Sequence, residues 1–295
     1  MTLTIDFQEY VQRRKAGAAG ERGEGYAYEG DRKVLRALRR LRPVELAVGQ
    51  VVTLSKNFLK SDLLGSSVKV GPQQFVRLHR IGNHCAETLG VPPPTLYVLP
   101  DIARVNAATY GTDEDSFIMV TAAAVDALSD QELAFVIGHE CGHIQNNHAV
   151  FLTLLTVLQQ GLGQLLSVMF APLLLPLTLA LQGWSRAAEI TCDRAGLLCC
   201  QDLQVAQRSF VKLAVGSRRL CEEINMDSYL DQGRQGREGV GRMAELRHSH
   251  PYLPKRVEAL QVFADSALYR GAVGLDGGYD RDELEKRTAD VIKVL

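Results

Sequence analysis

His139-Glu140-Cys141-Gly142-His143, near the middle of the chain, has the pattern H-E-x-x-H. Residues four positions apart lie on the same face of an α-helix, so His139 and His143 can direct imidazole nitrogens at one metal ion. Glu140 is rotated by about 100° from His139 around the helix axis. Its carboxylate can therefore reach a water on that ion without binding the ion itself. The pattern indicates a metal site with two histidine ligands and a glutamate base.

The residues before this motif favour the helix that the motif requires. Residues 133–138 are apolar, and Ser129 precedes them with Glu132 three positions later. This spacing is typical of a capping box and predicts that a helix begins near Asp130. The alternative is a pair of surface histidines beside a core, with no metal. A capped apolar helix is the context that the metal motif needs, so we favour the metal site.

Length and composition predict an ordinary globular protein. The chain has 295 residues, of which 46% are hydrophobic and 23% charged, enough for one large domain or two small ones. A net charge of −1 gives no reason to expect a nucleic-acid partner. The six cysteines show no paired C-x-x-C spacing, and no secretory signal is recognised at the start of the sequence. We therefore expect reduced thiols and a cytoplasmic protein.

Short strands are expected before the motif helix, at residues 95–99, within 103–110 and at 116–121. Together with the helices expected along the rest of the chain, they predict a mostly helical α+β fold of the zincin type, with a small antiparallel sheet beside the H-E-x-x-H helix. An extended peptide can add to the edge strand of such a sheet. We expect Asn106, Ala107 and Ala108 to form that edge and to bind substrate. A purely structural strand is the alternative.

No charged residue occurs from Ala149 to Ser185. Two apolar pieces, 149–158 and 165–181, are separated by residues 159–164, and two prolines are expected to interrupt the second piece. A path out and back has about 17 residues per leg, which only just matches the hydrocarbon core of a bilayer. The segment can therefore span a membrane, dip into one leaflet, or form a buried helical hairpin.

Residues 32–42 are a second candidate for membrane contact. Apolar residues at helical spacing are flanked there by six basic residues. The segment is either a basic amphipathic helix on an anionic membrane surface or a docked helix with a solvated outer face. Together, segments 149–185 and 32–42 leave two locations open, one free in the cytoplasm and one at the cytoplasmic face of the inner membrane.

A catalytic zinc ion usually has three protein ligands and keeps one position open. Glu189 and Asp193 lie four positions apart on an expected helix, so their carboxylates share a face. Glu189 can supply the third ligand. Asp193 can accept a hydrogen bond from a ligand imidazole and orient its ring.

The order of these features resembles a known family. H-E-x-G-H, then an uncharged hydrophobic segment, then W-S-R-x-A-E-x-x-x-D-R-A-G-L at 184–197 resembles the HtpX-like branch of the gluzincin metallopeptidases. That branch contains the HtpX heat-shock proteases and the CAAX prenyl endopeptidases, and the resemblance spans roughly residues 66–264. It implies that His139, His143 and Glu189 bind one Zn²⁺ per chain and that Glu140 is the catalytic carboxylate.

The family also has a late His-Pro element, matched here by His250-Pro251 and followed by Arg256. By this resemblance His250 would donate a hydrogen bond to the oxyanion, and Arg256 would support the metal ligands. A His-Pro pair that merely starts a helix is the alternative. The membrane spans of HtpX and of the prenyl endopeptidases have no counterpart recognised here, which weakens any inference about membrane substrates. Cys141 and Cys192, inside the two motifs, are interpreted as small packing residues.

We expect a zinc-dependent endopeptidase that cleaves protein or peptide substrates with metal-activated water and Glu140 as the general base. The alternative is a latent or non-proteolytic zinc-containing scaffold that binds extended peptides, either in solution or at a membrane surface. A structural protein of the membrane surface would leave the metal-site residues unexplained. The expected organisation is an N-terminal helical segment (1–65), a metallopeptidase domain (66–270) that includes the apolar hairpin 149–185, and a C-terminal helical tail (271–295).

Overall fold

A computed structural model describes residues 25–39, 65–112, 115–159, 162–216, 218–221, 223–235 and 250–293. Most of the predicted N-terminal segment, and the end of the basic stretch 32–42, therefore lie outside the described residues. The elements in chain order are α2 (Glu29–Arg39), β1 (Val68–Lys69), α4 (Val76–Leu89), β2 (Thr95–Leu99), β3 (Ala107–Gly111), β4 (Ser116–Thr121), α5 (Ala122–Ala127), α6 (Asp130–Gln145), α7 (Ala149–Gln159), α8 (Leu162–Cys200), α9 (Leu203–Val215), α10 (Arg218–Cys221), α11 (Met226–Gln235), α13 (Leu253–Ala264), α14 (Ala267–Ala272) and α15 (Arg281–Ile292). The predicted mostly helical α+β fold is confirmed.

The sheet is small and mixed. Its strand order is β1-β2-β4-β3; β1 pairs with β2 and β3 with β4 in antiparallel fashion, whereas β2 and β4 are parallel. The prediction of a purely antiparallel sheet was therefore wrong for the central pair. All six residues of β4 are buried, and burial on both faces places β4 between β2 and β3. The strand β3 is left at the edge, as expected for Ala107 and Ala108.

The helix α6 begins where the sequence predicted, at Asp130. Ser129 Oγ accepts a hydrogen bond from the Glu132 backbone N–H at 3.3 Å, and Glu132 Oε2 accepts one from the Ser129 N–H at 2.7 Å. The capping box is thus complete and satisfies two polar groups at the helix start. Residues 132–143 are all buried. The helix that carries the H-E-x-x-H motif is therefore the central helix of the core.

Two glycines allow α6 to lie very close to α8. A Cβ atom at Gly138 would lie 2.7 Å from Cys199 Cβ, and one at Gly142 would lie 2.9 Å from Ala195 Cβ. Real Cβ atoms do not approach so closely, so larger residues at either position would push the helices apart. The close packing brings the motif helix and the helix of Glu189 together.

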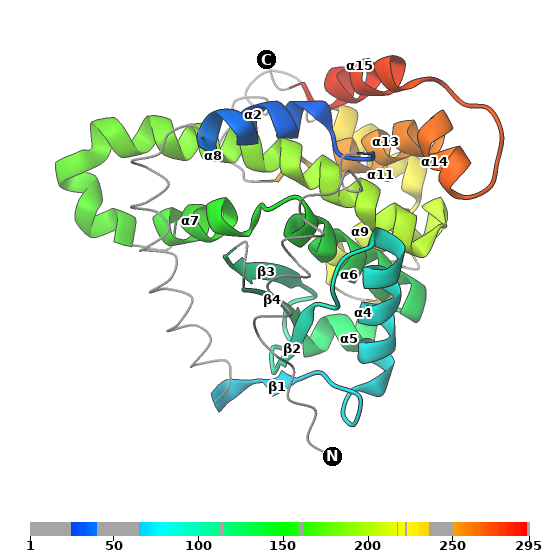
Figure 1. The fold of residues 1–295 in the computed structure, drawn as a ribbon, viewed down its shortest axis with the longest axis horizontal. Coiled ribbons are helices and arrows are strands. Elements are labelled where there is room, and N and C mark those ends of the chain that lie inside the picture. The colour runs from blue at the N-terminus through cyan, green and yellow to red at the C-terminus, as the bar shows by residue number, and fades with distance from the viewer. Residues whose placement is uncertain are drawn as a thin grey trace.

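The uncharged segment forms a helical hairpin of α7 and the first part of α8. Phe151, Leu154 and Leu155 of α7 pack against Leu181 and Trp184 of α8 in a buried apolar cluster. The backbone of α8 is helical from residue 162 to 200, so the expectation that its prolines interrupt the helix was wrong. Figure 1 shows α2 lying along α8, with α7 and the edge strand β3 on the opposite side of α8.

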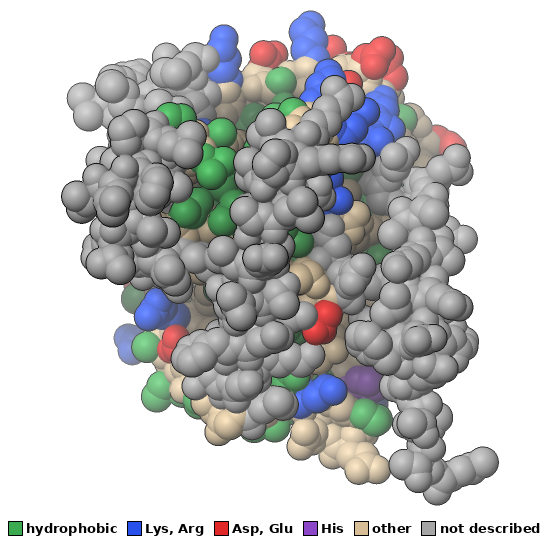
Figure 2. All heavy atoms as spheres, turned by 60° about the vertical axis from the view of Figure 1, so that its left-hand side comes forward, with side chains coloured by type: hydrophobic (Ala, Val, Ile, Leu, Met, Phe, Trp, Pro, Cys, Tyr) green, Lys and Arg blue, Asp and Glu red, His purple; other side chains and the backbone are tan. Residues whose placement is uncertain are grey.

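The basic helix α2 is docked through its apolar residues, since Leu35 and Leu38 pack against the same cluster. Val34 of α2 and Leu179 of α8 are each about two-fifths exposed. Figure 2 shows hydrophobic side chains gathered on this side of the molecule near lysine and arginine side chains. Among the described residues, none of the helices is both long enough and apolar enough to cross a bilayer. Contact of these segments with a membrane stays a prediction.

The last helix, α15, packs against α13 and is tied to α8. Arg194, fully buried in α8, donates hydrogen bonds to Glu285 Oε1 at 2.8 Å and to Thr288 Oγ1 at 2.9 Å. Leu284 beside them is fully buried in the main core. The C-terminal helix therefore braces the helix that carries Glu189.

Candidate active site

Three predicted ligands converge between α6 and α8. His139 Nε2 and His143 Nε2 are 3.2 Å apart. Glu189 Oε2 lies 3.5 Å from His139 Nε2, and Glu189 Oε1 lies 3.5 Å from His143 Nε2. One ligand atom from each residue can be chosen so that all lie within 4.8 Å of one another, and all three residues are buried. This spacing allows one ion to touch all three side chains.

Asp193 and Arg256 support His139 from behind. His139 Nδ1 lies 2.9 Å from Asp193 Oδ1, and Arg256 donates to both oxygens of Asp193, at 2.5 and 2.8 Å. The carboxylate can accept a hydrogen bond from Nδ1–H, and in this tautomer the His139 Nε2 has a free lone pair. The structure thus brings Asp193 next to the imidazole of a predicted ligand, His139.

Arg256 also compensates the charge of Glu189. Its Nη1 lies 3.0 Å from Glu189 Oε2, and its guanidinium stacks over the Phe210 ring, 4.9 Å from the centroid. Burial alone would raise the pKa of Glu189, but the charges of His250 and Arg256 outweigh it, and the pKa lies well below its ordinary value. The carboxylate is therefore available as an anionic ligand.

The carboxylate of Glu189 favours a positive charge at His143. Burial alone would lower the pKa of His143, but its hydrogen bond to Glu189 and the charge of that carboxylate raise the pKa instead. A divalent cation can supply this charge in place of a proton. Two imidazoles and one carboxylate are also a donor set that suits Zn²⁺. The residues present fit a zinc ion.

Glu140 lies on the same helix and points to the edge strand. Thr109 Oγ1 donates to Glu140 Oε2 at 2.6 Å and also lies 3.2 Å from the Glu140 backbone oxygen. Both side chains are buried, at 6% exposure each. The hydroxyl of β3 thus fixes the carboxylate next to the ligand set.

A cleft of about 460 Å³ opens over this centre. Its lining includes residues 105–110, from the end of the preceding loop and from β3, together with His250, Leu253 and Arg256. His250 is mostly exposed, and its Nδ1 lies 3.0 Å from Glu189 Oε2. The structure therefore brings every predicted site residue to one cleft or to the groups directly behind it.

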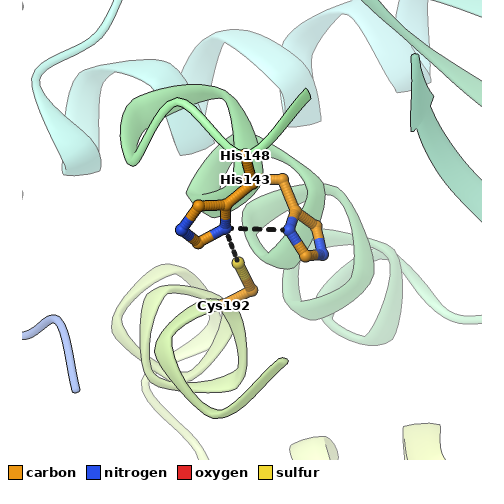
Figure 3. Close-up of side chains that lie close together, drawn as sticks. All are labelled: His143, His148 and Cys192. Atoms are coloured by element: carbon orange, nitrogen blue, oxygen red, sulfur yellow. Dashed lines mark hydrogen bonds between the residues drawn. The ribbon is translucent and has the colours of Figure 1, made fainter. Parts of the chain in front are cut away.

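Three residues at this centre were missed from the sequence: Thr109, His148 and Asp31. His148 Nδ1 lies 3.1 Å from His143 Nδ1, as Figure 3 shows, and His148 Nε2 lies 3.1 Å from Asp31 Oδ2. Thr109 carries no spacing signal, because its contact with Glu140 depends on how the strand lies over α6. A histidine close after the motif was a weak signal for His148. Asp31 directly precedes the basic stretch 32–42 and carried no signal of its own.

Comparison with known proteins assigns the chain to a family. The pattern of peptidase family M48 matches residues 72–264. The plastoglobule-localized metallopeptidase 48 of Arabidopsis thaliana, a chloroplastic protein, is 32% identical over 189 residues, which are 62% of this chain and 53% of the relative. This chain thus spans about half the length of that relative.

Two proteins named protease HtpX homolog are also similar. The one from Pyrococcus furiosus is 25% identical over 221 residues, covering 66% of this chain and 76% of the relative. The one from Thermoanaerobacter pseudethanolicus is 28% identical over 92 residues, covering 31% of this chain and 30% of the relative. No solved structure matches the chain. The HtpX-like resemblance is confirmed, and the chain belongs to peptidase family M48, a family of metallopeptidases.

Proposed function

We propose that this chain is a zinc-dependent endopeptidase that hydrolyses peptide bonds in protein or peptide substrates. The observation that carries the proposal is the convergence of His139, His143 and Glu189 beside Glu140, in a cleft walled by an edge strand. One Zn²⁺ per chain would be held by these three ligands. When bound, the ion supplies Lewis-acid activation of water and of the scissile carbonyl.

Glu140 supplies the proton transfers in this proposal. Its carboxylate accepts a proton from the attacking water and then delivers it to the nitrogen of the leaving amine. Thr109 donates to one carboxylate oxygen, Oε2, and leaves the other for the water. A base that is fixed beside the reacting atoms shortens the search for a productive geometry.

The edge strand and other residues that line the cleft would bind the substrate. Ala107 and Ala108 pair with β4 on one side, and β3 is the last strand of the sheet that the described residues form. An extended peptide can therefore continue the sheet along Asn106–Ala108. His250 also lines the cleft, with its Nδ1 3.0 Å from Glu189 Oε2, and would donate to the oxyanion of the tetrahedral intermediate.

Replacing Glu140 by glutamine tests the function directly. We expect Glu140→Gln to keep one zinc per chain, because the three ligands are untouched, and to lose hydrolysis of casein or a peptide library by about 10²- to 10⁴-fold. A chelator should abolish wild-type activity, and added zinc should restore it. Glu87→Gln makes the same change on the exposed face of α4 and should match wild type.

Three outcomes would contradict the proposal. Full activity in Glu140→Gln would remove Glu140 from the chemistry. Wild-type protein that binds zinc and extended peptides but cleaves none under any condition would favour the alternative of a latent or non-proteolytic scaffold. Purified protein without a bound transition metal would contradict both the zinc endopeptidase and the zinc-containing scaffold.

We also propose a cytoplasmic location, in which segments 149–185 and 32–42 contact the membrane or remain free of it. The basic helix α2 and the exposed apolar side chains beside it support such contact. Alkaline carbonate extraction of cell membranes tests it: retention in the pellet would show an embedded segment, and release would exclude one.

A further inference from the structure

We propose that Asp31 and His148 are positioning residues of the metal site, which hold the imidazole of His143 in the tautomer that metal binding requires. The inference rests on the proposed zinc site. It extends that site to α2, which lies outside the family match at 72–264. The N-terminal helix would thus complete the support of a ligand on α6.

His143 and His148 contact each other through their ring nitrogens. His148 is fully buried, and its Nδ1 lies 3.1 Å from His143 Nδ1 (Figure 3). At this distance one nitrogen must carry a proton and the other must accept it. When His143 Nε2 binds the metal, the ring proton stays on Nδ1, and this N–H donates a hydrogen bond to His148. His148 Nδ1 is then the acceptor, so the His148 proton sits on Nε2.

The Nε2 atom of His148 lies next to a carboxylate. His148 Nε2 lies 3.1 Å from Asp31 Oδ2, and Asp31 is 1% exposed. Within the described residues Nε2 makes no well-aligned hydrogen bond, so Asp31 is the acceptor within reach of its proton. A carboxylate in this position holds His148 as the Nε2–H tautomer, and this tautomer is the one that accepts from His143.

Asp31 is itself held in place by two side chains of α8. Trp184 Nε1 donates to Asp31 Oδ1 at 2.9 Å, and Thr191 Oγ1 donates to Asp31 Oδ2 at 2.7 Å. The Trp184 ring also meets the His148 ring edge to face, with centroids 5.4 Å apart. A buried carboxylate is costly unless it is paired and hydrogen-bonded. The contact with His148 therefore accounts for an inward-facing acid on a helix whose other charged side chains lie mainly toward solvent.

A second metal site is the competing interpretation. Ligand atoms of His143, His148 and Cys192 also lie within 4.8 Å of one another. A metal there would bind Nδ1 of His143 while Nε2 binds the metal of the first site. Binding through both nitrogens requires His143 to lose both ring protons. Burial and the neighbouring carboxylates raise the pKa of the Cys192 thiol well above its ordinary value, and metals bind the thiolate. A hydrogen-bonded relay fits these side chains better.

The test compares two acidic residues in the first turn of α2. Asp31→Asn keeps the size of the side chain but removes the charged acceptor of His148. We expect zinc affinity, measured by competition with a chromophoric chelator, to fall by about 10- to 100-fold. Glu29→Gln makes the same change at an exposed side chain that pairs with Lys33 and should bind zinc as wild type does. Asp31→Asn protein with wild-type affinity would overturn the inference.

A second measurement reads the tautomer of His148 in the wild-type protein. In zinc-loaded wild-type protein labelled with ¹⁵N-histidine, we expect His148 to show an unprotonated Nδ1 and a protonated Nε2, with signals assigned through His148→Asn. A protonated Nδ1 on His148, or two metal ions per chain, would overturn the relay. Wild-type protein that binds no metal would overturn this inference together with the proposed function. Wild-type binding with an unchanged Asp31→Asn would overturn the inference alone.

Discussion

His139 and His143 lie one turn apart on α6, yet the structure supports them in different ways. Behind His139 stands a charged pair: Asp193 at 2.9 Å, held by two hydrogen bonds from Arg256. Behind His143 stands another imidazole, His148, which in turn meets the carboxylate of Asp31. The support of His139 is a directly contacting ion pair, whereas the support of His143 is longer and passes through a second imidazole.

This difference shows that two histidines proposed as equivalent ligands need not have equivalent supports. Asp193 is on the same helix as Glu189, so the support of His139 lies within the region that matches family M48. The support of His143 ends on α2, outside that region. The two sides can therefore be perturbed separately.

Removing Arg256 should give the largest effect, on the His139 side. In metal-free protein, Arg256→Met would leave Glu189 and Asp193 buried without their partner, and we expect the free energy of unfolding to fall by about 3–5 kcal/mol. Urea unfolding in chelator measures it. Arg287→Met is the control, because Arg287 pairs with Glu283 at the exposed surface and should change stability by less than about 1 kcal/mol. Equal losses in the two variants would refute a charged support.

The two carboxylates can then be compared directly. We expect Asp193→Asn to weaken zinc binding toward the upper end of about 10- to 100-fold and Asp31→Asn toward the lower end. The reason is that Asp193 contacts its ligand histidine, whereas Asp31 acts through His148. Competition titrations on both variants decide the order. A larger loss for Asp31→Asn would reverse our ranking of the two sides.

Thr109 separates proton transfer from metal binding, since it touches neither support. Thr109→Val removes the donor to Glu140, and we expect kcat/KM to fall about tenfold, the loss of one hydrogen bond to a charged group. Zinc affinity should stay at the wild-type value, and Thr109→Ser should recover activity. A parallel loss of zinc would mean that β3 helps to hold the ligands.

The smallest effect is expected at the start of α6. Ser129→Ala removes one side of the capping box and should lower stability by about 1 kcal/mol, measured by urea unfolding. Ser129→Asp keeps a capping oxygen and should stay near wild type. Neither variant should change zinc affinity, because the motif lies more than two turns further along the helix. A clear change in affinity would show that the cap also positions the ligands.

Local patterns predicted the elements better than their arrangement. The capping box of Ser129 and Glu132 predicted where α6 begins, because its atoms are all close in sequence. The parallel pairing of β2 with β4 was missed, since strand order depends on which strand the helices bury. The helix α8 continues through two prolines that were expected to interrupt it. The packing of this long helix therefore outweighed the tendency of proline to break helices.

The candidate site divides in the same way. Glu189 and Asp193 could be predicted because four-residue spacing on a helix brings carboxylates to one face. Thr109 and Asp31 could not, since each reaches the site from an element whose position depends on the whole fold. Glu140, the partner of Thr109, is 31 positions away in the sequence. His148, the partner of Asp31, is separated from it in the sequence by all the strands of the sheet.

By itself the sequence determined which side chains can bind a metal and act as a base, because helical periodicity is a property of a few consecutive residues. The tertiary structure decided which groups stand behind those side chains. The α6–α8 contact at Gly138 and Gly142, the docking of α2 on α8, and the edge position of β3 together place Asp193, Asp31 and Thr109. These contacts arise only when surfaces distant in sequence are buried against one another, and no local spacing records them.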